Sequence, residues 1–395
     1  MAEKKKILFV NYSLHSGGIE KSLVTLLSLF DYDTYDVDLQ LFINEGMFLS
    51  RVPQKVNLLK PLFPSAYKDN IRKAFFALLF GGHPLLAFCR LFVSFAGLKG
   101  TVGGRLKKMW LIERRFIKPA EKEYDAVIAF MEGQPIYYAV TKVKSKNKIG
   151  FIHGDYAAMG LCRDFDFDYL SSLNALCTVS ESCLAALKKA FPEFENKLHL
   201  IYNIISADFI YSLAAKGTGF NDGRTGIKVL SIARLSHQKG LDIAMPAIAG
   251  LKEKGFKFCW YIIGIGPEEQ NLKEMVRSLG IEDCVCFLGE QANPYPFLKE
   301  CDIYFQPSRF EGKPIAVDEA MVMHCPILLS DFSTAADQID SGKNGLIVPM
   351  TSDGLEEGLE NLMLNGERRA AFSDALAKSS LTNENEINKL YALIV

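Results

Sequence analysis

The sequence has almost no excess charge of either sign and no paired cysteine motif. Its 395 residues carry a formal net charge of -1, which disfavours nucleic acid as a bulk electrostatic partner. The nine cysteines are scattered without a Cys-x-x-Cys pair. No secretory signal is expected either, because the apolar run after MAEKKK is short and has the pattern of a strand. We therefore expect a cytoplasmic protein whose thiols are small core residues in a reducing compartment.

An uninterrupted apolar run of bilayer length is also missing. The run from Ala74 to Gly97 is nearly long enough, but Gly-Gly-His-Pro at 81–84 breaks it and Arg90 interrupts its second half. Basic residues border the run: Lys68, Arg72 and Lys73 before it, and Lys99, Arg105, Lys107, Lys108, Arg114 and Arg115 after it. Segment 69–118 is therefore either a helical hairpin in the core or a pair of helices lying at an anionic membrane surface.

Strands and helices alternate along the whole chain, which is 49% hydrophobic and long enough for two domains. Strands are expected at 6–11, 36–43, 125–130, 147–152, 174–179, 227–233, 258–263, 284–288, 302–306, 326–329 and 345–348. Continuous apolar strands such as KVLSIA and CWYIIG are typical of parallel sheets that are covered on both faces. The pattern predicts an α/β protein with two Rossmann-like, doubly wound domains facing each other across a cleft.

The expected domain boundaries follow from this alternation. We assign residues 1–205 to an amino-terminal domain that includes segment 69–118, and residues 206–377 to a second Rossmann-like domain. Residues 378–395 are expected to form a helix that packs back towards the first domain. The glycine-rich stretch 217–223 has the composition of a mobile linker.

Open parallel sheets bind ligands at the carboxyl ends of their strands, and two candidates lie there in the first half. Gly17 and Gly18 follow the first strand, where a helix should begin with exposed backbone N–H groups suited to an anion. A tight turn would explain the same pair. The absence of a Gly-x-Gly-x-x-Gly motif disfavours a nicotinamide dinucleotide. His153 ends the strand at 147–152, and either backbone groups or a substrate hydroxyl or phosphate would satisfy it.

The second half has more candidates at the same kind of edge. Arg234 and Lys239 follow the strand at 227–233, and two cations there are suited to clamping a diphosphate without a metal. Gly264 and Gly266 follow the next strand and permit close backbone approach. The loop with Gly289 and Glu290 follows the third strand.

The stretch FEGKPIAVDEA places two carboxylates, Glu311 and Glu319, around the start of a helix. Pro314 suits the first helical position, because that position needs no backbone donor. Backbone donors around the helix start are available for phosphate oxygens or sugar hydroxyls, and we assign them to Gly312, Lys313 and Ile315. One carboxylate could hold a group beyond the phosphates and the other a vicinal diol, so a nucleoside-diphosphate sugar would supply both partners.

This set of residues resembles glycosyltransferase family 4, whose members are retaining enzymes of the GT-B fold. The resemblance rests on Glu311-x7-Glu319, on Arg234 and Lys239 upstream, and on Gly17-Gly18 near the amino end. It covers essentially the whole chain. Lys313 within EGKPIAVDEA is similar to the bacterial surface- and capsular-polysaccharide branch, although many members have a more apolar helix after the first glutamate.

The resemblance implies a role for each of these residues. Arg234 and Lys239 would bind the donor diphosphate, Glu311 and the following backbone would hold the transferred sugar, and Glu319 would hold the ribose. Gly17 and Gly18 would lie near the phosphates, and His153 near the reacting face of the sugar. The resemblance thus implies that Glu311, Arg234, Lys239 and His153 are catalytic. The remaining donor-binding residues would be Gly264, Gly266, Gly289, Glu290, Gly312, Lys313, Pro314 and Ile315.

The implied activity is a retaining, metal-independent hexosyl transfer from a nucleoside-diphosphate sugar, UDP-linked by preference, to a glycan or lipid-linked acceptor. No cofactor is expected, and the run Asp164, Asp166, Asp168 is interpreted as an acidic loop, not a metal site. Polysaccharide-building members extend lipid-linked acceptors, which implies peripheral association with the inner face of the cell membrane. Two other functions stay open: a nucleotide-sugar epimerase on the same scaffold, and a catalytically silent partner subunit.

Overall fold

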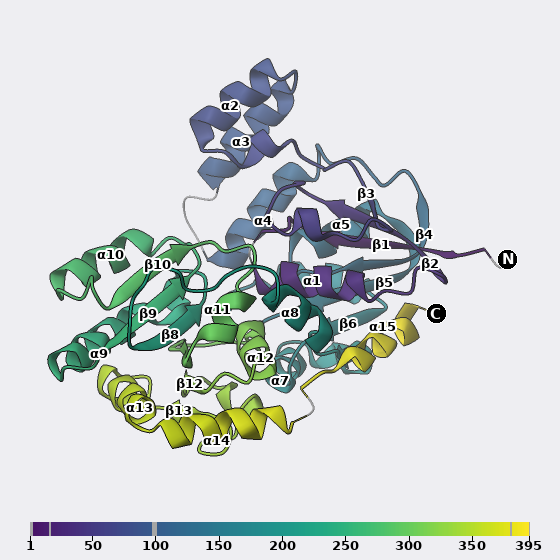
Figure 1. Ribbon diagram of the computed structural model, residues 1–395. Helices are drawn as coiled ribbons and strands as arrows, with labels where there is room; N and C mark the ends of the chain where they lie inside the picture. The colour runs from purple at the N-terminus through teal and green to yellow at the C-terminus, as the bar shows by residue number, and fades with distance from the viewer. Residues whose placement is uncertain (1–2, 16, 97–100, 380, 395) are drawn as a thin grey trace. The chain divides into compact units, whose positions relative to one another are not determined.

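The computed structural model describes residues 3–15, 17–96, 101–379 and 381–394. The chain forms two compact units, and Figure 1 labels their helices and strands. Unit 1 comprises Met1–Ile204 together with Asn385–Val395, and unit 2 comprises Ile205–Glu384. Gly97 and Lys99, which belong to the apolar run and its basic border, lie outside the described residues.

Unit 1 is built on a seven-stranded parallel sheet in the order β3-β2-β1-β4-β5-β6-β7. Its strands are β1 (Lys5–Asn11), β2 (Tyr35–Leu41), β3 (Asn57–Leu58), β4 (Glu123–Ala129), β5 (Lys144–Ile152), β6 (Ala175–Thr178) and β7 (Leu198–Leu200). Its helices are α1 (Gly18–Ser28), α2 (Ile71–Phe80), α3 (Pro84–Ala96), α4 (Val102–Glu113), α5 (Gln134–Lys142), α6 (Arg163–Ser171), α7 (Glu181–Ala190) and α15 (Ile387–Ile394). The central strand β1 is fully buried from Ile7 to Val10, as a sheet covered on both faces requires.

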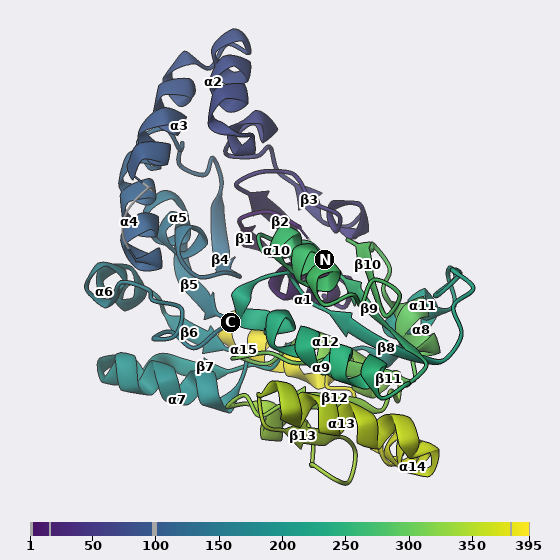
Figure 2. The ribbon, with the colours of Figure 1, turned by 90° about the vertical axis from the view of Figure 1, so that its left-hand side faces the viewer.

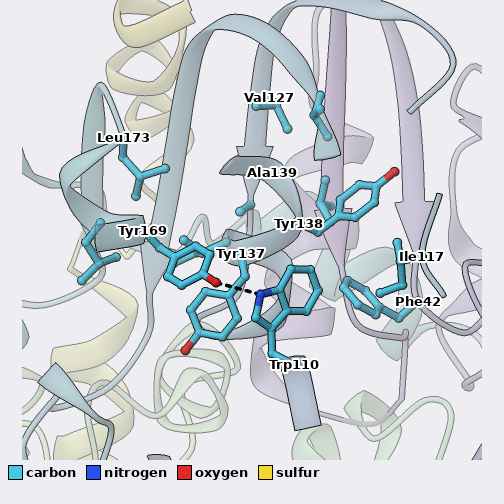
Figure 3. Packing of buried hydrophobic residues seen from close by; sticks show 14 of the residues in the cluster. Phe42, Trp110, Ile117, Val127, Tyr137, Tyr138, Ala139, Tyr169 and Leu173 are labelled. Carbon is cyan, nitrogen blue, oxygen red and sulfur yellow. Dashed lines mark hydrogen bonds between the residues drawn. The ribbon is translucent and has the colours of Figure 1, made fainter. Parts of the chain in front are cut away.

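An aromatic cluster fills one side of the unit 1 sheet (Figure 3). Trp110 of α4 is fully buried, and its indole N–H donates to the Tyr169 hydroxyl at 3.0 Å. The Tyr137 ring packs against both, with its centre 5.6 Å from that of Trp110 and 4.4 Å from that of Tyr169. The buried indole N–H therefore has an acceptor, and helices α4, α5 and α6 are held to one another.

Helices α2 and α3 form a hairpin at one end of unit 1 (Figures 1 and 2). Arg90 of α3 fastens it, because its guanidinium donates to the carbonyls of Tyr67, at 2.8 Å, and Asp69, at 3.3 Å. The Tyr67 hydroxyl donates at 2.8 Å to the buried carboxyl of Glu113, the last residue of α4. Burial raises the pKa of Glu113 to about 7 against the opposing hydrogen bonds from Tyr67 and Gln134.

The outward face of this hairpin is apolar. Six large apolar side chains on it are at least half exposed: Phe76, Phe80, Leu85, Phe88, Phe92 and Phe95. In α3 they recur at 85, 88, 92 and 95, which is the spacing of one helix face. None of the helices in the described part of the chain is long and apolar enough to cross a membrane.

The last helix, α15, belongs to unit 1 although it follows unit 2 in sequence. Its Tyr391 ring stacks on Tyr35, with centres 5.4 Å apart, and meets Phe30 edge-on at 5.2 Å. The Tyr391 hydroxyl accepts a 2.7 Å hydrogen bond from the backbone N–H of Asp31. These aromatic contacts bury the apolar face of a helix that would be too short to be stable alone.

Unit 2 contains a six-stranded parallel sheet in the order β10-β9-β8-β11-β12-β13, the order of a doubly wound dinucleotide-binding sheet. Its strands are β8 (Ile227–Ile232), β9 (Phe258–Ile263), β10 (Val285–Gly289), β11 (Ile303–Gln306), β12 (Ile327–Ser330) and β13 (Leu346–Val348). Its helices are α8 (Ala207–Ala214), α9 (Leu241–Glu253), α10 (Glu269–Ser278), α11 (Tyr295–Glu300), α12 (Ile315–Val322), α13 (Ser352–Leu364) and α14 (Gly366–Ala377). Two doubly wound α/β units confirm the predicted fold class.

The glycine-rich stretch 217–223 is not a linker between the units, which contradicts the prediction from its composition. It lies inside unit 2. The carboxylate of Glu300 accepts the backbone N–H groups of Gly219 and Phe220, each at 3.2 Å. The ring of Phe220 lies on Tyr261, with centres 4.2 Å apart. Glycine content alone did not reveal these anchors, because they come from residues far along the chain.

Candidate functional site

Three loops at the carboxyl edge of the unit 2 sheet are joined by backbone hydrogen bonds. The loop after β8 bonds the loop after β9, through Leu235 N to Ile265 O at 3.0 Å, and Gly264 N bonds Gly289 O of β10 at 2.8 Å. A β-carbon on Gly264 would lie 2.0 Å from the carbonyl oxygen of Ala233, so only glycine fits there. The predicted close approach at Gly264 is thus present, between two protein loops.

The loop after β8 is also fixed against the loop after β11. Gly240 has φ +63°, and a β-carbon on it would lie 1.9 Å from the carbonyl oxygen of Pro307. Arg309 closes the junction with two parallel hydrogen bonds to Asp242, at 2.7 and 2.6 Å, at the start of α9. This bidentate pair lowers the pKa of Asp242 and makes the junction rigid. The residues between these anchors, including Lys239, therefore have a defined position.

Lys239 and Glu311, predicted separately, form an ion pair at this junction. Lys239 Nζ lies 2.5 Å from Glu311 Oε1, and their side chains are only 17% and 6% exposed. The same oxygen accepts hydrogen bonds from Gln306 Nε2 at 2.9 Å and from Ser308 Oγ at 2.6 Å. Arg234 differs from Lys239: it is exposed and makes no side-chain hydrogen bond or ion pair within the described ranges.

Glu319 lies in α12, where the hydroxyl of Tyr295 donates to its Oε1 at 2.8 Å. Both side chains are buried. The helix begins at Ile315, one residue later than predicted. Pro314, predicted at the first helical position, is instead the N-cap, with φ -68° and ψ 110°. Its carbonyl accepts from Val317 N at 3.0 Å, which closes the first turn of the helix.

The other predicted donor-binding residues also lie in or next to loops at the carboxyl edge of the unit 2 sheet. Lys313 pairs with Asp318 of α12 at 3.9 Å. Gly266 is required by space, because a β-carbon on it would lie 2.2 Å from the carbonyl oxygen of Leu235. Gly289 has φ +65°. Glu290, Gly312 and Ile315 are partly exposed.

Glu319 provides a test of the predicted division of labour between the glutamates. Glu319→Gln should weaken binding of free UDP, because an amide offers a ribose diol one acceptor oxygen where a carboxylate offers two. Tyr295→Phe is the matched partner: it removes the hydroxyl that orients Glu319 and leaves the charge in place. Calorimetry with UDP measures both. Unchanged affinity in folded Glu319→Gln protein would remove this residue from the nucleotide site.

In unit 1, Gly17 and Gly18 stand at the start of α1 as predicted, with Gly17 as the N-cap. A carboxylate of the protein itself reaches this position, because a β-carbon on Gly17 would lie 2.0 Å from Glu20 Oε2. Glu20 is the third residue of the helix, from which a glutamate reaches back to the N-cap. The helix start predicted to bind an external anion therefore has a carboxylate of the protein beside it.

His153 lies one residue beyond β5, at the carboxyl edge of the unit 1 sheet. Its Nε2 lies 3.0 Å from the Phe130 carbonyl oxygen, which only accepts, so Nε2 carries the hydrogen and Nδ1 is the acceptor. Glu132, from the loop after the neighbouring strand β4, accepts the His153 backbone N–H at 3.2 Å. Burial lowers the pKa of His153 to about 4 and raises that of Glu132. The imidazole is thus neutral at physiological pH.

This depressed pKa predicts a specific pH dependence of stability. Below the ordinary pKa of about 6.5, the unfolded chain binds a proton that folded His153 refuses until the pH approaches 4. His153 therefore lowers stability as the pH falls from 6.5 to 4. His153→Gln, which keeps an amide donor for Phe130, should lose less urea resistance than wild type between pH 7 and pH 4.5. Parallel losses in the two proteins would contradict the shift.

The aspartates at 164, 166 and 168 do not form an acidic loop, because they lie on α6. Asp166 is buried and accepts hydrogen bonds from the hydroxyls of Tyr137 and Tyr156. It thus joins helix α6 to α5. Within the described residues no group of three or more His, Cys, Asp or Glu side chains is arranged to hold a metal ion.

Sequence reasoning missed the residues that hold the predicted ones in place. Gln306, Ser308 and Tyr295 support the two glutamates, and Glu132 lies beside His153. A glutamine at the end of the apolar strand IYFQ was a usable signal for Gln306, since a polar residue on a central strand needs a partner. Nothing local marked Tyr295, which is 24 residues from Glu319.

Comparison with known proteins finds a family that matches most of unit 2. Residues 220–379, nearly all of this unit, match the family described as "Glycosyl transferases group 1". This range includes the predicted diphosphate-binding cations Arg234 and Lys239 and the two glutamates of the FEGKPIAVDEA stretch. It also includes the glycine-containing loops after β9 and β10.

Named relatives differ in how much of the chain they match. An amylovoran biosynthesis glycosyltransferase of Erwinia amylovora is 35% identical over 131 residues, which is 31% of this chain and 32% of the relative. The matched part thus spans about a third of that relative. Over 92% of this chain and 91% of the relative, it is 22% identical to an N-acetylgalactosaminyltransferase of Campylobacter jejuni whose named substrate is a diphospho-undecaprenol glycan.

Solved structures share the fold over the whole chain. A crystal structure of Anabaena Alr3699/HepE in complex with UDP and glucose aligns with a TM-score of 0.70 over 98% of both chains, at 19% identity. WaaG, a glycosyltransferase involved in lipopolysaccharide biosynthesis, aligns with a TM-score of 0.64 at 14% identity. At these identities the likeness concerns the fold, and both neighbours share the two α/β units.

Proposed function

Residues 220–379 match the group 1 glycosyl transferases, and from that match we propose that this chain belongs to the family and transfers a sugar from a nucleoside-diphosphate sugar to a growing surface glycan. The observation that supports this most strongly is the position of Lys239 and Arg234. Both follow β8 at the carboxyl edge of the unit 2 sheet, on a loop that is fixed to its neighbours. Open α/β sheets bind nucleotides at this edge.

The proposed chemistry is substitution at the anomeric carbon with retention, as in the family that the sequence resembles. The bond from the anomeric carbon to the diphosphate oxygen breaks, and the acceptor oxygen bonds that carbon on the same face. The acceptor proton passes to the departing phosphate oxygen. Lys239 and Arg234 stabilise the negative charge that grows on the diphosphate, so these two cations provide the main catalytic contribution.

UDP is the proposed nucleotide, and hexose the proposed sugar. The likeness to a fold that holds UDP in HepE supports testing uridine nucleotides first. A thermal-shift comparison of UDP, GDP, ADP and their hexose conjugates decides the base, because a ligand that binds only the folded protein raises its melting temperature. Stabilisation by UDP and UDP-hexoses is the expected result. No shift with any of these nucleotides would contradict the proposed function.

A lipid-linked glycan is the proposed acceptor, and the enzyme would then work peripherally at the inner face of the cell membrane. The Campylobacter relative, whose named acceptor carries diphospho-undecaprenol, supports this assignment. The α2–α3 hairpin of unit 1 supplies a suitable surface. Its exposed side chains include Phe80 at 83%, Leu85 at 70% and Phe95 at 67%. Large apolar side chains exposed together on one face mark an interaction surface, whereas single exposed ones are ordinary.

The charges around this apolar face favour an anionic surface. Segment 71–96 contains no acidic residue, and the neighbouring helix α4 and its end expose a set of cations: Arg105, Lys107, Lys108, Arg114 and Arg115. The acidic residue of α4, Glu113, is buried and has a raised pKa. Phenylalanines at the headgroup boundary with cations beside them are typical of peripheral membrane helices. We assign this face to an anionic bilayer.

A further inference from the structure

The Glu311 carboxylate is surrounded by more hydrogen-bond donors of the protein than a contact with a sugar would require. Three donors converge on its Oε1: Lys239 Nζ at 2.5 Å, Ser308 Oγ at 2.6 Å and Gln306 Nε2 at 2.9 Å. Its Oε2 receives one weak contact, from Gln238 at 3.4 Å. Lys239 is therefore neutralised by the protein itself, at the position where a phosphate oxygen would need its charge.

The two neutral donors are themselves fixed in orientation. The hydroxyl of Tyr304 donates to Gln306 Oε1 at 2.7 Å, which turns the amide nitrogen of Gln306 towards Glu311. Ser330 Oγ donates at 2.6 Å to the Ser308 carbonyl and anchors that residue. Glu311, Gln306 and Ser308 are all buried. If Lys239 moved away, the carboxylate would keep two buried hydrogen bonds, which a buried anion requires.

Arg234 and Lys239, the two cations proposed to bind the diphosphate, therefore differ in their contacts within the protein. Arg234 is exposed and has no side-chain partner in the described part of the chain, so a phosphate can bind it without breaking a contact. Lys239 can bind phosphate only by sharing or leaving Glu311. A lysine that is only 17% exposed and lies 2.5 Å from a carboxylate makes a charge-assisted bond that must be weakened first.

We propose that Glu311 is the resident counter-ion of Lys239, from which a bound diphosphate draws the lysine away. Gln306 and Ser308 are positioning residues that keep the Glu311 carboxylate in place after the exchange. The inference rests on the proposed function in one respect, since it takes a nucleoside diphosphate as the ligand. It gives Glu311 a role in nucleotide binding that is separate from any contact with the transferred sugar.

Binding of free UDP tests this, because UDP carries no sugar for Glu311 to hold. Glu311→Gln frees Lys239 and should tighten UDP binding in calorimetry by about tenfold, which corresponds to about 1.4 kcal/mol. Ser308→Ala removes a competing donor from Glu311 and should strengthen its hold on Lys239. UDP binding to that variant should therefore weaken by several-fold. A role in folding alone would not shift the two variants in opposite directions.

The double variant Lys239→Ala/Glu311→Gln separates this exchange from simple repulsion between Glu311 and the diphosphate. It should bind UDP as Lys239→Ala does, because without Lys239 there is nothing to release. Equal tightening by Glu311→Gln with and without Lys239 would overturn the counter-ion role, as would weaker UDP binding by Glu311→Gln alone. If wild type itself bound no nucleoside diphosphate, the proposed function would fail before this inference was reached.

Discussion

Replacing Lys239 or Arg234 with alanine is expected to lower kcat/KM for sugar transfer by on the order of 10²-fold or more, the scale seen when a preorganised charge stabiliser is removed. Negative charge on the diphosphate grows as the anomeric bond breaks, so both cations interact more strongly with the transition state than with the bound donor. The loss should appear mainly in kcat for Lys239, because Glu311 already holds this lysine before the donor binds.

Arg234→Ala is the easier of the two variants to interpret, because it disturbs fewer contacts within the protein. Arg234 holds nothing else within the described residues, so Arg234→Ala leaves the rest of unit 2 intact. Lys343→Ala is a matched control, since Lys343 is a 79% exposed lysine whose ion pair is with the nearby Asp340. Circular dichroism establishes that each variant is folded. Wild-type turnover in folded Arg234→Ala and Lys239→Ala proteins would remove both residues from the site.

Serine at Phe80, Phe92 and Phe95 together is expected to abolish binding to anionic vesicles, with a loss of affinity on the order of 10²-fold or more. These rings are 83%, 64% and 67% exposed, and each fully buried ring contributes roughly 1.5–3 kcal/mol. Glutamate at Lys107, Lys108, Arg114 and Arg115 should weaken binding as well, since each cation near the surface adds about 1 kcal/mol. Liposome flotation at low and high salt measures both effects.

The matched control for the apolar face is Leu364→Ser, which alters a 71% exposed apolar residue on α13 of unit 2. It should float as wild type does. Equal flotation of the triple serine variant and wild type, or no flotation by either, would contradict the membrane assignment. A wild-type dimer in vesicle-free solution that the triple serine variant converts to a monomer would assign the face to a second copy of the chain instead.

The strands could be predicted because their chemistry is local. KVLSIA and CWYIIG are continuous apolar runs, and they became β8 and β9 in the interior of a parallel sheet. The edge strands β3 and β7 escaped detection because they are short, with two and three residues, and partly exposed. The start of helix α7 at Glu181 also has a local cause, since Ser180 caps it by accepting a hydrogen bond from Cys183 N.

The candidate site was harder to predict, because its contacts join residues that are distant in sequence. Glu311 and Lys239 were identified from their places after strands, yet their ion pair links positions separated by 72 residues. Composition could not show that Gln306 and Ser308 would share the same oxygen. The exposure of the α2–α3 face was likewise undecided by sequence, since the same phenylalanine pattern suits a core or a surface.

Incubation of the protein with a UDP-hexose, with and without a lipid-linked glycan acceptor, tests the central claim most directly. NMR of the product follows the anomeric configuration, and UDP release follows turnover. We predict that UDP appears in amounts equal to the glycan formed, only when acceptor is present, with the donor's anomeric configuration kept in the new linkage. Consumption of the donor without acceptor to give an epimer, or an inverted linkage in the glycan, would contradict retaining sugar transfer by this chain.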